Sequence, residues 1–276
     1  MSYHGNQSSG ADDSSINLLS FNIQAGTTTD RYHHYVTRSW KQLLPNNERS
    51  RNMDAIAELI SNYDIVGLQE ADTGSLRSGF INQTRYLSRE AGFAWHTDQS
   101  NRKVGNVACA GNGVMARWQP TEVVSHKLPG SIPGRGVLTL RYGDGEDALL
   151  VVVLHLALGR RARTSQLGFV SELLQGHRDV VVMGDLNTDI NSPELGAFVD
   201  QNELQIPTAD LLSFPSWQPL RAIDHIMLSN TLEVHDSDVL DVPFSDHCPV
   251  IVKIALPSAL QGLETAQHQS RRYQNQ

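Results

Sequence analysis

The sequence predicts a protein of the α/β (α+β) class. Two apolar runs, residues 149–154 and 180–183, have the character of strands that are covered on both faces. Between residues 48 and 60 the apolar side chains recur at helical spacing instead, and Asp54 and Glu58 occupy the opposite face. The chain therefore combines buried strands with amphipathic helices that pack on a sheet.

The same patterns, together with turn residues, place the remaining elements. Further strands are expected at 16–22, 65–70, 92–95, 114–117, 137–142, 221–228, 234–241 and from 250, and further helices at 80–91, 160–174 and 193–202. The expected organisation is a flexible N-terminal segment (1–15), a folded domain (16–257) and a polar, disordered C-terminal tail (258–276).

Composition and charge limit the class of protein and its partners. The 276 residues include 39% hydrophobic and 19% charged residues, which is ordinary for a soluble globular domain. A formal net charge of −8 repels polyanions, which disfavours a non-specific coat of nucleic acid. Cys109 and Cys248 lack metal-type spacing, and the sequence contains neither a secretory signal nor an apolar run of about 18 residues. We therefore expect a soluble cytoplasmic protein without a transmembrane segment, and a monomer by default.

Polar side chains stand where the apolar runs end. Asp185 and Asn187 follow residues 180–183 after Gly184, a glycine that marks a turn or a close backbone approach. A carboxylate and an amide at a strand end can hold a water or metal and a phosphoryl oxygen, whereas an Asx turn that caps the strand is the structural alternative. The whole set is Asn22, Glu70, His155, Asp185, Asn187, Asp224, Asp246 and His247.

This set of side chains indicates a hard cation and phosphoryl chemistry. Glu70 closes an apolar strand, and a charge at that place needs a partner such as a cation. Oxygen ligands without cysteine favour Mg²⁺ or Mn²⁺ over zinc. A single histidine at a strand end, such as His155, is more often structural, although imidazole can also donate to a phosphoryl oxygen. The sequence signatures of zinc modules, Walker NTPases, dinucleotide-binding enzymes and α/β-hydrolases are absent.

Six short motifs, taken in order, resemble those of the endonuclease/exonuclease/phosphatase superfamily, the relatives of pancreatic deoxyribonuclease. They are Phe21-Asn22, Gln69-Glu70, Leu154-His155-Leu156, Gly184-Asp185-Leu186-Asn187, Ile223-Asp224-His225-Ile226 and Ser245-Asp246-His247-Cys248-Pro249. Residues 112–117 and Arg135-Gly136 also resemble elements of bacterial branches. The resemblance covers residue 16 to about 256 and implies a four-layer αββα sandwich, in which two mixed β-sheets pack face to face between helices.

The resemblance also implies a metal site and a residue that acts on water. Glu70 corresponds to the principal metal ligand, with Asn22 and Asp246 close by. Asp185 corresponds to the residue that orients or deprotonates the attacking water, and Asn187 helps to position it. The implied cofactor is Mg²⁺ or Mn²⁺.

Two imidazoles complete the implied catalytic set. His155 and His247 are expected to contact the phosphoryl oxygens, and Asp224 is expected to hold His247 in its working tautomer. His225 departs from the family pattern, because many relatives carry tyrosine there, and this difference bears on the polarity of the cleft.

These features predict a divalent-metal-dependent phosphoester hydrolase, specifically a phosphodiesterase acting on a small or flexible phosphodiester such as a phospholipid head group, a nucleotide-like molecule or a single strand. A DNA or RNA endonuclease or exonuclease is the alternative, followed by a catalytically inactive binding module on the same fold. Nucleic acid is an allowed partner, but the negative net charge argues against a high-affinity duplex binder. The candidate substrate-binding residues are Arg77, Ser78, Asn112, Arg135, Arg160, Arg163 and Trp217.

Overall fold

The computed structural model describes residues 15–26, 47–104, 108–130, 134–261 and 263. In this part of the chain, a first sheet has the strand order β11-β12-β1-β2-β4-β3. Its strands are β1 (Ser15–Asn22), β2 (Ile65–Asp72), β3 (Trp95–Val104), β4 (Ala108–Ala116), β11 (Val234–Val239) and β12 (Val250–Ala255). Within it, β1 and β2 run parallel and the other neighbours run antiparallel, so the sheet is mixed.

A second mixed sheet of the described residues has the order β5-β6-β7-β8-β10-β9. Its strands are β5 (Glu122–Lys127), β6 (Gly136–Tyr142), β7 (Leu149–His155), β8 (Asp179–Asp185), β9 (Leu204–Gln205) and β10 (Asp224–Ser229). Here β7 and β8 form the parallel pair. Before β11, the described residues form four helices longer than one turn. They are α2 (Asn47–Ile60), α3 (Gln83–Glu90), α4 (Arg160–Leu174) and α5 (Pro193–Gln201).

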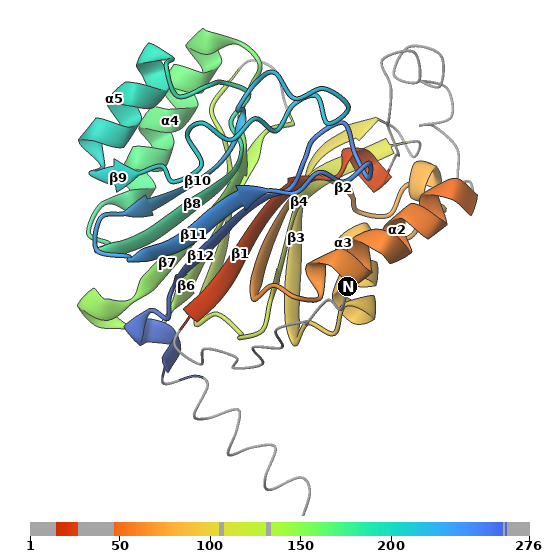
Figure 1. The fold of residues 1–276 in the computed structure, drawn as a ribbon, viewed down its shortest axis with the longest axis horizontal. Coiled ribbons are helices and arrows are strands. Elements are labelled where there is room, and N and C mark those ends of the chain that lie inside the picture. Colours follow the sequence, from red (N-terminus) through yellow and green to blue (C-terminus); the bar gives the residue numbers. More distant parts are fainter. Residues whose placement is uncertain (1–14, 27–46, 105–107, 131–133, 262, 264–276) are drawn as a thin grey trace, which may run out of the picture.

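The elements form four layers, as the sequence resemblance implied (Figure 1). The two sheets pack on each other through apolar side chains such as Leu18 of β1 and Val181 of β8, both completely buried. The outer face of the first sheet is covered by α2 and α3 through residues such as Ile56. The outer face of the second sheet is covered by α4 and α5 through residues such as Leu167 and Phe198. Strand residues therefore alternate between two apolar environments, which is why the central strands read as continuous apolar runs.

Two edge strands differ from the sequence prediction. The expected short strand at 92–95 is the long strand Trp95–Val104, and Glu122–Lys127 is a strand that was not predicted. Both lie at the edge of a sheet and are largely polar or exposed, so hydrophobic periodicity does not mark them. The helix expected at 80–91 begins at Gln83, where the Asn82 side chain accepts a hydrogen bond from the Arg85 backbone N–H and caps the helix.

The ends of the chain lie largely outside the described residues, including the expected N-terminal segment except for Ser15. After β12 the chain forms a helical turn at 258–261, and Leu260 in this turn is completely buried in the core between the sheets. The first residues of the expected tail therefore pack on the domain. Within the described residues, no helix is both long and apolar enough to cross a membrane.

Candidate active site

Parallel strand pairing gathers four of the candidate residues at one edge of the two sheets. In the first sheet the parallel pairing of β1 with β2 stops at Asn22 opposite Gln69, one residue before Glu70, and β2 itself continues to Asp72. In the second sheet β7 and β8 end together, with His155 opposite Asp185. The carboxyl ends of parallel strands meet at the same edge of a sheet, so side chains that are far apart in sequence are brought together there.

Asp224 and His247 reach the same edge from antiparallel strands. Asp224 is the first residue of β10 and pairs with Asp185 in the neighbouring strand. Strand β12 runs antiparallel to β1, with Val250 opposite Ser20, so His247, just before β12, lies beside the end of β1. The two sheets are joined across this edge by a hydrogen bond of 3.0 Å from Asn22 Nδ2 to Asp185 Oδ2.

The backbone around the site adopts conformations that ordinary strand residues avoid. Gly184 has φ = 152°, and a Cβ atom at this position would lie 1.9 Å from the carbonyl oxygen of Leu154. The sequence prediction of a close backbone approach at Gly184 is thus confirmed. Glu70 lies in a register shift between β2 and β4 and has φ = 56°, in the left-handed region. Such conformations in non-glycine residues occur preferentially at functional sites.

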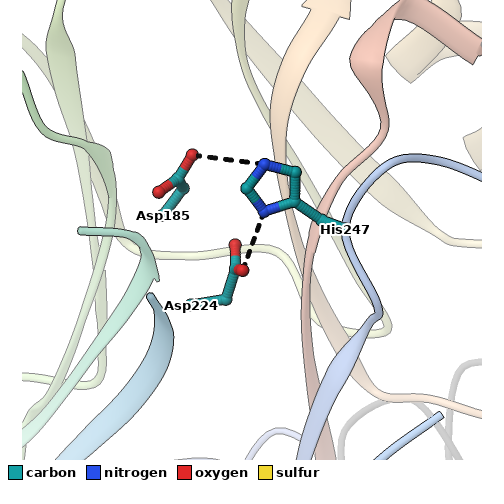
Figure 2. Close-up of side chains that lie close together, drawn as sticks. All are labelled: Asp185, Asp224 and His247. Atoms are coloured by element: carbon teal, nitrogen blue, oxygen red, sulfur yellow. Dashed lines mark hydrogen bonds and ion pairs between the residues drawn. The ribbon is translucent and has the colours of Figure 1, made fainter. Parts of the chain in front are cut away.

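Asp224 and His247 form a buried dyad (Figure 2). His247 Nδ1 and Asp224 Oδ2 lie 2.8 Å apart, and the two residues are 6% and 1% exposed. Asp224 is held in turn by Ser213, whose Oγ donates a hydrogen bond of 2.6 Å to the same Oδ2 atom. Phe214 packs on the other side of the imidazole, with ring centroids 4.8 Å apart. The carboxylate fixes Nδ1 as a donor and leaves Nε2 directed toward Asp185.

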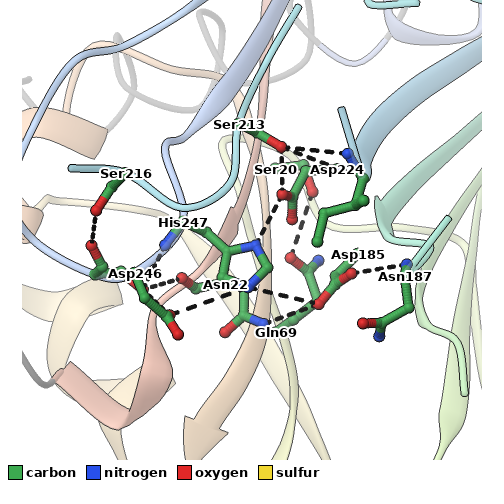
Figure 3. Close-up of polar contacts among 12 residues, drawn as sticks. Ser20, Asn22, Gln69, Asp185, Asn187, Ser213, Ser216, Asp224, Asp246 and His247 are labelled. Carbon is green, nitrogen blue, oxygen red and sulfur yellow. Dashed lines mark hydrogen bonds and ion pairs between the residues drawn. The ribbon is translucent and has the colours of Figure 1, made fainter. Parts of the chain in front are cut away.

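Asp185 is the centre of the polar network (Figure 3). Besides the bond from Asn22, its Oδ1 accepts a hydrogen bond of 2.9 Å from the Asn187 backbone N–H. Its Oδ2 lies 3.3 Å from His155 Nε2 and 3.9 Å from His247 Nε2. The bond from Asn187 is the Asx turn of the structural alternative, so the turn and the polar cluster coexist. The Asn187 side chain is anchored separately, by a bond of 3.0 Å from Nδ2 to the carbonyl oxygen of Leu156.

The charges of this network favour an ionised carboxylate beside a protonated imidazole. Burial by itself would raise the pKa of Asp185, but His155, His247 and the Asn187 backbone N–H together hold it well below its usual range. Burial by itself would lower the pKa of His247, but Asp224, Asp185 and Asp246 raise it to about 10. Asp185 is therefore suited to accept hydrogen bonds from water, and His247 to donate from Nε2.

His155 differs from His247 in the partner of its second nitrogen. Arg135 NH1 lies 2.8 Å from His155 Nδ1. A guanidinium group can only donate, so Nδ1 is the acceptor and Nε2 carries the hydrogen of a neutral imidazole. Both histidines therefore present an N–H group from Nε2. The Nδ1 atom of His247 is bonded to the Asp224 carboxylate, whereas that of His155 is bonded to the Arg135 guanidinium.

The residues expected to bind a metal lie on the first-sheet side of the cluster. Gln24 connects two of them, because its backbone N–H donates to Asn22 Oδ1 and its Nε2 donates to Asp246 Oδ2. Asp246 is 7% exposed, and burial raises its pKa to about 6, with His247 opposing the rise and the charges of Glu70 and Asp185 adding to it. Carboxylates that repel one another beside a carboxamide are a set of oxygen donors that suits a divalent cation, so the residues present fit a Mg²⁺ or Mn²⁺ ion.

A second group of potential ligands consists of Asp185, Asp224 and His247, with one atom from each within 4.8 Å of the others. In this group His247 Nδ1 and Asp224 Oδ2 already share a hydrogen bond. That bond already engages one of the candidate ligand atoms of each of these two residues.

Among the candidate substrate-binding residues, Asn112 and Arg135 lie in a pocket beside His155. Asn112 is 1% exposed and donates from Nδ2 to the carbonyl oxygen of Gly136, at 2.8 Å. Trp217 is partly exposed in the loop that carries Phe214.

Of the other four candidates, three lie elsewhere or are occupied. Arg163 is 8% exposed, and its NH2 lies 2.7 Å from Glu194 Oε1, so it ties α4 to α5. The Arg160 side chain is largely exposed and also faces Glu194, with 3.4 Å between Nε and Oε2. The hydroxyl group of Ser78 is hydrogen-bonded within its own loop, because Oγ donates to Asp72 Oδ1 and to the carbonyl oxygen of Ser75. Arg77 lies in the short turn Leu76–Ser78, and its side chain falls outside the described part of the chain.

Several residues of the site carry no signal in the sequence. Ser213 and Gln24 orient Asp224 and Asp246, but an isolated serine or glutamine in a loop has no pattern that marks such a role. His225, which departs from the family pattern, is completely buried with Nε2 near the carbonyl oxygens of Ala222 and Thr188, at 3.1 and 3.3 Å. It is thus held by backbone groups beneath the strand end.

The fold and the site define the class of this protein. It is a four-layer sandwich with a cluster of carboxylates and imidazoles at one edge of both sheets. The model of the Endonuclease/Exonuclease/phosphatase family matches residues 19–247, and the chain belongs to that family.

Solved structures share the fold at low sequence identity. A family protein from Beutenbergia cavernae is 20% identical with a TM-score of 0.67, covering 89% of this chain and 72% of its own. A mannosyl-6-phosphatase from Bacteroides thetaiotaomicron is 18% identical with a TM-score of 0.65, covering 87% of this chain and 100% of its own. The human Nocturnin catalytic domain with bound sulfate is also 18% identical with a TM-score of 0.65, at 87% and 93% coverage. A search of curated protein sequences gives no match.

Proposed function

We propose that the chain is a divalent-metal-dependent phosphoester hydrolase, and specifically a phosphodiesterase that acts on a small or flexible phosphodiester. The observation that carries this proposal is the arrangement around Asp185. The buried carboxylate of Asp185 faces the Nε2 atoms of His155 and His247, and Asp224 is hydrogen-bonded to the Nδ1 atom of His247. This combination sets an acceptor for the hydrogens of water beside two donors for phosphoryl oxygens.

The metal part of the proposal concerns Glu70, Asn22 and Asp246. These residues offer two carboxylates and one carboxamide. The pKa of Asp246 is raised first by burial and then by the charges of Glu70 and Asp185, while His247 opposes the rise. When bound, a Mg²⁺ or Mn²⁺ ion polarises phosphoryl oxygens and lowers the pKa of water.

The groups of the chain itself then act as follows. Asp185 remains ionised and accepts a hydrogen bond from the attacking water, which orients the water for in-line attack on phosphorus. His247, protonated because its pKa is raised, donates from Nε2 to an oxygen on which negative charge develops, while Asp224 keeps its ring in place. His155 donates from Nε2 as a neutral imidazole, because Arg135 occupies its Nδ1.

The solved relatives support phosphoester chemistry without fixing the substrate. One is named a mannosyl-6-phosphatase, and the Nocturnin domain holds a sulfate anion, which resembles phosphate in shape and charge. The preference for a small or flexible substrate over a duplex rests on the net charge of −8. A nuclease acting on duplex DNA or RNA is the alternative.

Turnover of bis(p-nitrophenyl) phosphate tests the proposal. We expect hydrolysis with Mg²⁺ or Mn²⁺, none in EDTA, and a loss of about two to four powers of ten in the Asp185→Asn variant. Asp200→Asn, at an exposed position of α5, is the matched control and should retain wild-type turnover. A protein that binds metal but hydrolyses neither this diester nor the corresponding monoester would instead be an inactive binding module.

A further inference from the structure

A pocket of about 200 Å³ lies beside the catalytic cluster, between the ends of the two sheets. It is bordered by Glu70 and Asn112 from the first sheet, by His155 from the second sheet and by Arg135, which directly precedes β6 of the second sheet. Arg102 of β3 completes its outer wall. The pocket therefore opens directly next to the atoms that we assign to catalysis, and it has room for a chemical group far larger than one water.

The two arginines of this pocket have no carboxylate within ion-pair distance among the described residues. The only side-chain hydrogen bond of Arg135 among the described residues is the one from NH1 to His155, which leaves the other N–H groups of the guanidinium without a partner there. Burial lowers the pKa of Arg135, with Asp185 and Glu70 opposing the fall and Arg102 adding to it. Two guanidinium groups that lie close together in a partly buried pocket, without a carboxylate paired to either, are stabilised by a bound anion.

Asn112 adds a second kind of unsatisfied group to the same pocket. Its Oδ1 atom is buried and has no hydrogen-bond partner among the described residues, although its Nδ2 atom is bonded to the carbonyl oxygen of Gly136. A buried acceptor without a partner costs free energy unless a donor is supplied. A hydroxyl group on the bound molecule would supply one.

We propose that the pocket of Arg102, Asn112 and Arg135 binds a second anionic group of the substrate, next to the ester that is hydrolysed. The inference rests on the proposed hydrolase function and narrows its substrate class to small hydroxylated molecules with two phosphate or similar groups. The guanidinium groups of Arg102 and Arg135 hold the second anion, and Asn112 Oδ1 accepts from a neighbouring hydroxyl. Because Arg135 also contacts His155, an anion in the pocket fixes the arginine that sets the tautomer of this histidine.

Binding of a matched pair of ligands tests the inference. Adenosine 3′,5′-bisphosphate and adenosine 5′-monophosphate differ by one phosphate and both carry a sugar hydroxyl, and their affinities can be measured by calorimetry with Mg²⁺ present. We expect the bisphosphate to bind about ten- to a hundredfold more tightly, which is the range of a hydrogen-bonded charge pair. In the Arg102→Gln variant this ratio should fall toward one. Arg178→Gln, which removes a largely exposed arginine at the opposite end of β8, should keep the wild-type ratio.

Equal affinities in the wild-type protein would overturn the inference, and so would a preference that survives in Arg102→Gln. Turnover of bis(p-nitrophenyl) phosphate by the same preparations separates this result from the proposed function. A preference for the bisphosphate without any turnover would keep the second-anion pocket and refute the hydrolase. Turnover without the preference would keep the hydrolase and refute the pocket.

Discussion

Replacement of Asp246 by asparagine should stabilise the metal-free protein at neutral and alkaline pH. Burial, together with the charges of Glu70 and Asp185, raises the pKa of Asp246 from 3.8 to about 6, even though His247 opposes the rise. A difference of this size corresponds to about 3 kcal/mol of folding free energy. The asparagine variant cannot ionise and avoids this loss, but it weakens the bonds that Asp246 accepts from Gln24 and Ser245. We therefore expect a net gain of about 1–2 kcal/mol.

The direction of the pH dependence follows from the raised pKa. A group that holds its proton more tightly in the folded state contributes stability below its unfolded pKa, and this contribution disappears as pH rises through the folded pKa. The wild-type protein should lose stability between pH 3.8 and about 6 through Asp246, whereas Asp246→Asn should not. The two proteins should accordingly differ most at pH 8, by about half as much at pH 5, and converge only below pH 3.8, where Asp246 is protonated in the folded and the unfolded state alike.

Thermal unfolding followed by circular dichroism in EDTA measures this difference. For a domain of this size we expect about 2–4 °C for each kcal/mol, so Asp246→Asn should melt several degrees above the wild-type protein at pH 8. Added Mg²⁺ or Mn²⁺ should raise the melting temperature of the wild-type protein more than that of the variant. Asp200→Asn, on the exposed face of α5, controls for the loss of a negative charge in general. A variant that melts below the wild-type protein at pH 8, or by the same margin at pH 5 and pH 8, would refute the reasoning.

Three further predictions address the metal, the dyad and the substrate. Glu70→Gln should abolish metal-dependent turnover of bis(p-nitrophenyl) phosphate without lowering the melting temperature in EDTA, and retained Mg²⁺-dependent turnover would contradict the metal assignment. His247→Ala and Asp224→Ala should each slow turnover by about two to four powers of ten, and the double variant should be little worse than the slower single one; additive losses would show that the pair does not act as a unit. With a labelled duplex, a single strand and a small diester at about 50 to 200 mM salt, the duplex should be the poorest substrate. Best cleavage of the duplex, with an affinity that falls by several powers of ten over this range, would identify a nuclease instead.

The sequence by itself determined the strands that build the site and the residues at their ends. Residues 149–154 and 180–183 read as buried strands because each is covered on both faces, and His155 and Asp185 follow them directly. A polar side chain directly after an apolar run is a local feature, since it requires no knowledge of the partner strand. Glu70 was recognisable for the same reason, whereas Asp224 was marked as a carboxylate within the apolar alternation of residues 221–228. The four-layer order required the resemblance to a family as well, because hydrophobic periodicity does not specify which strands are neighbours.

Only the tertiary structure decided which polar side chains act together. Arg163 and Arg135 both looked suited to bind a phosphate, yet Arg163 is paired with Glu194, whereas Arg135 lies beside His155 at the site. Asn22 and Asp185 are 163 residues apart in the chain and share a hydrogen bond of 3.0 Å across the two sheets. A sequence pattern records burial and spacing within one element, whereas the partner of a polar group depends on the packing of elements that are distant in the chain. For this reason the roles of Ser213 and of the pocket beside His155 emerged only once the two sheets were placed face to face.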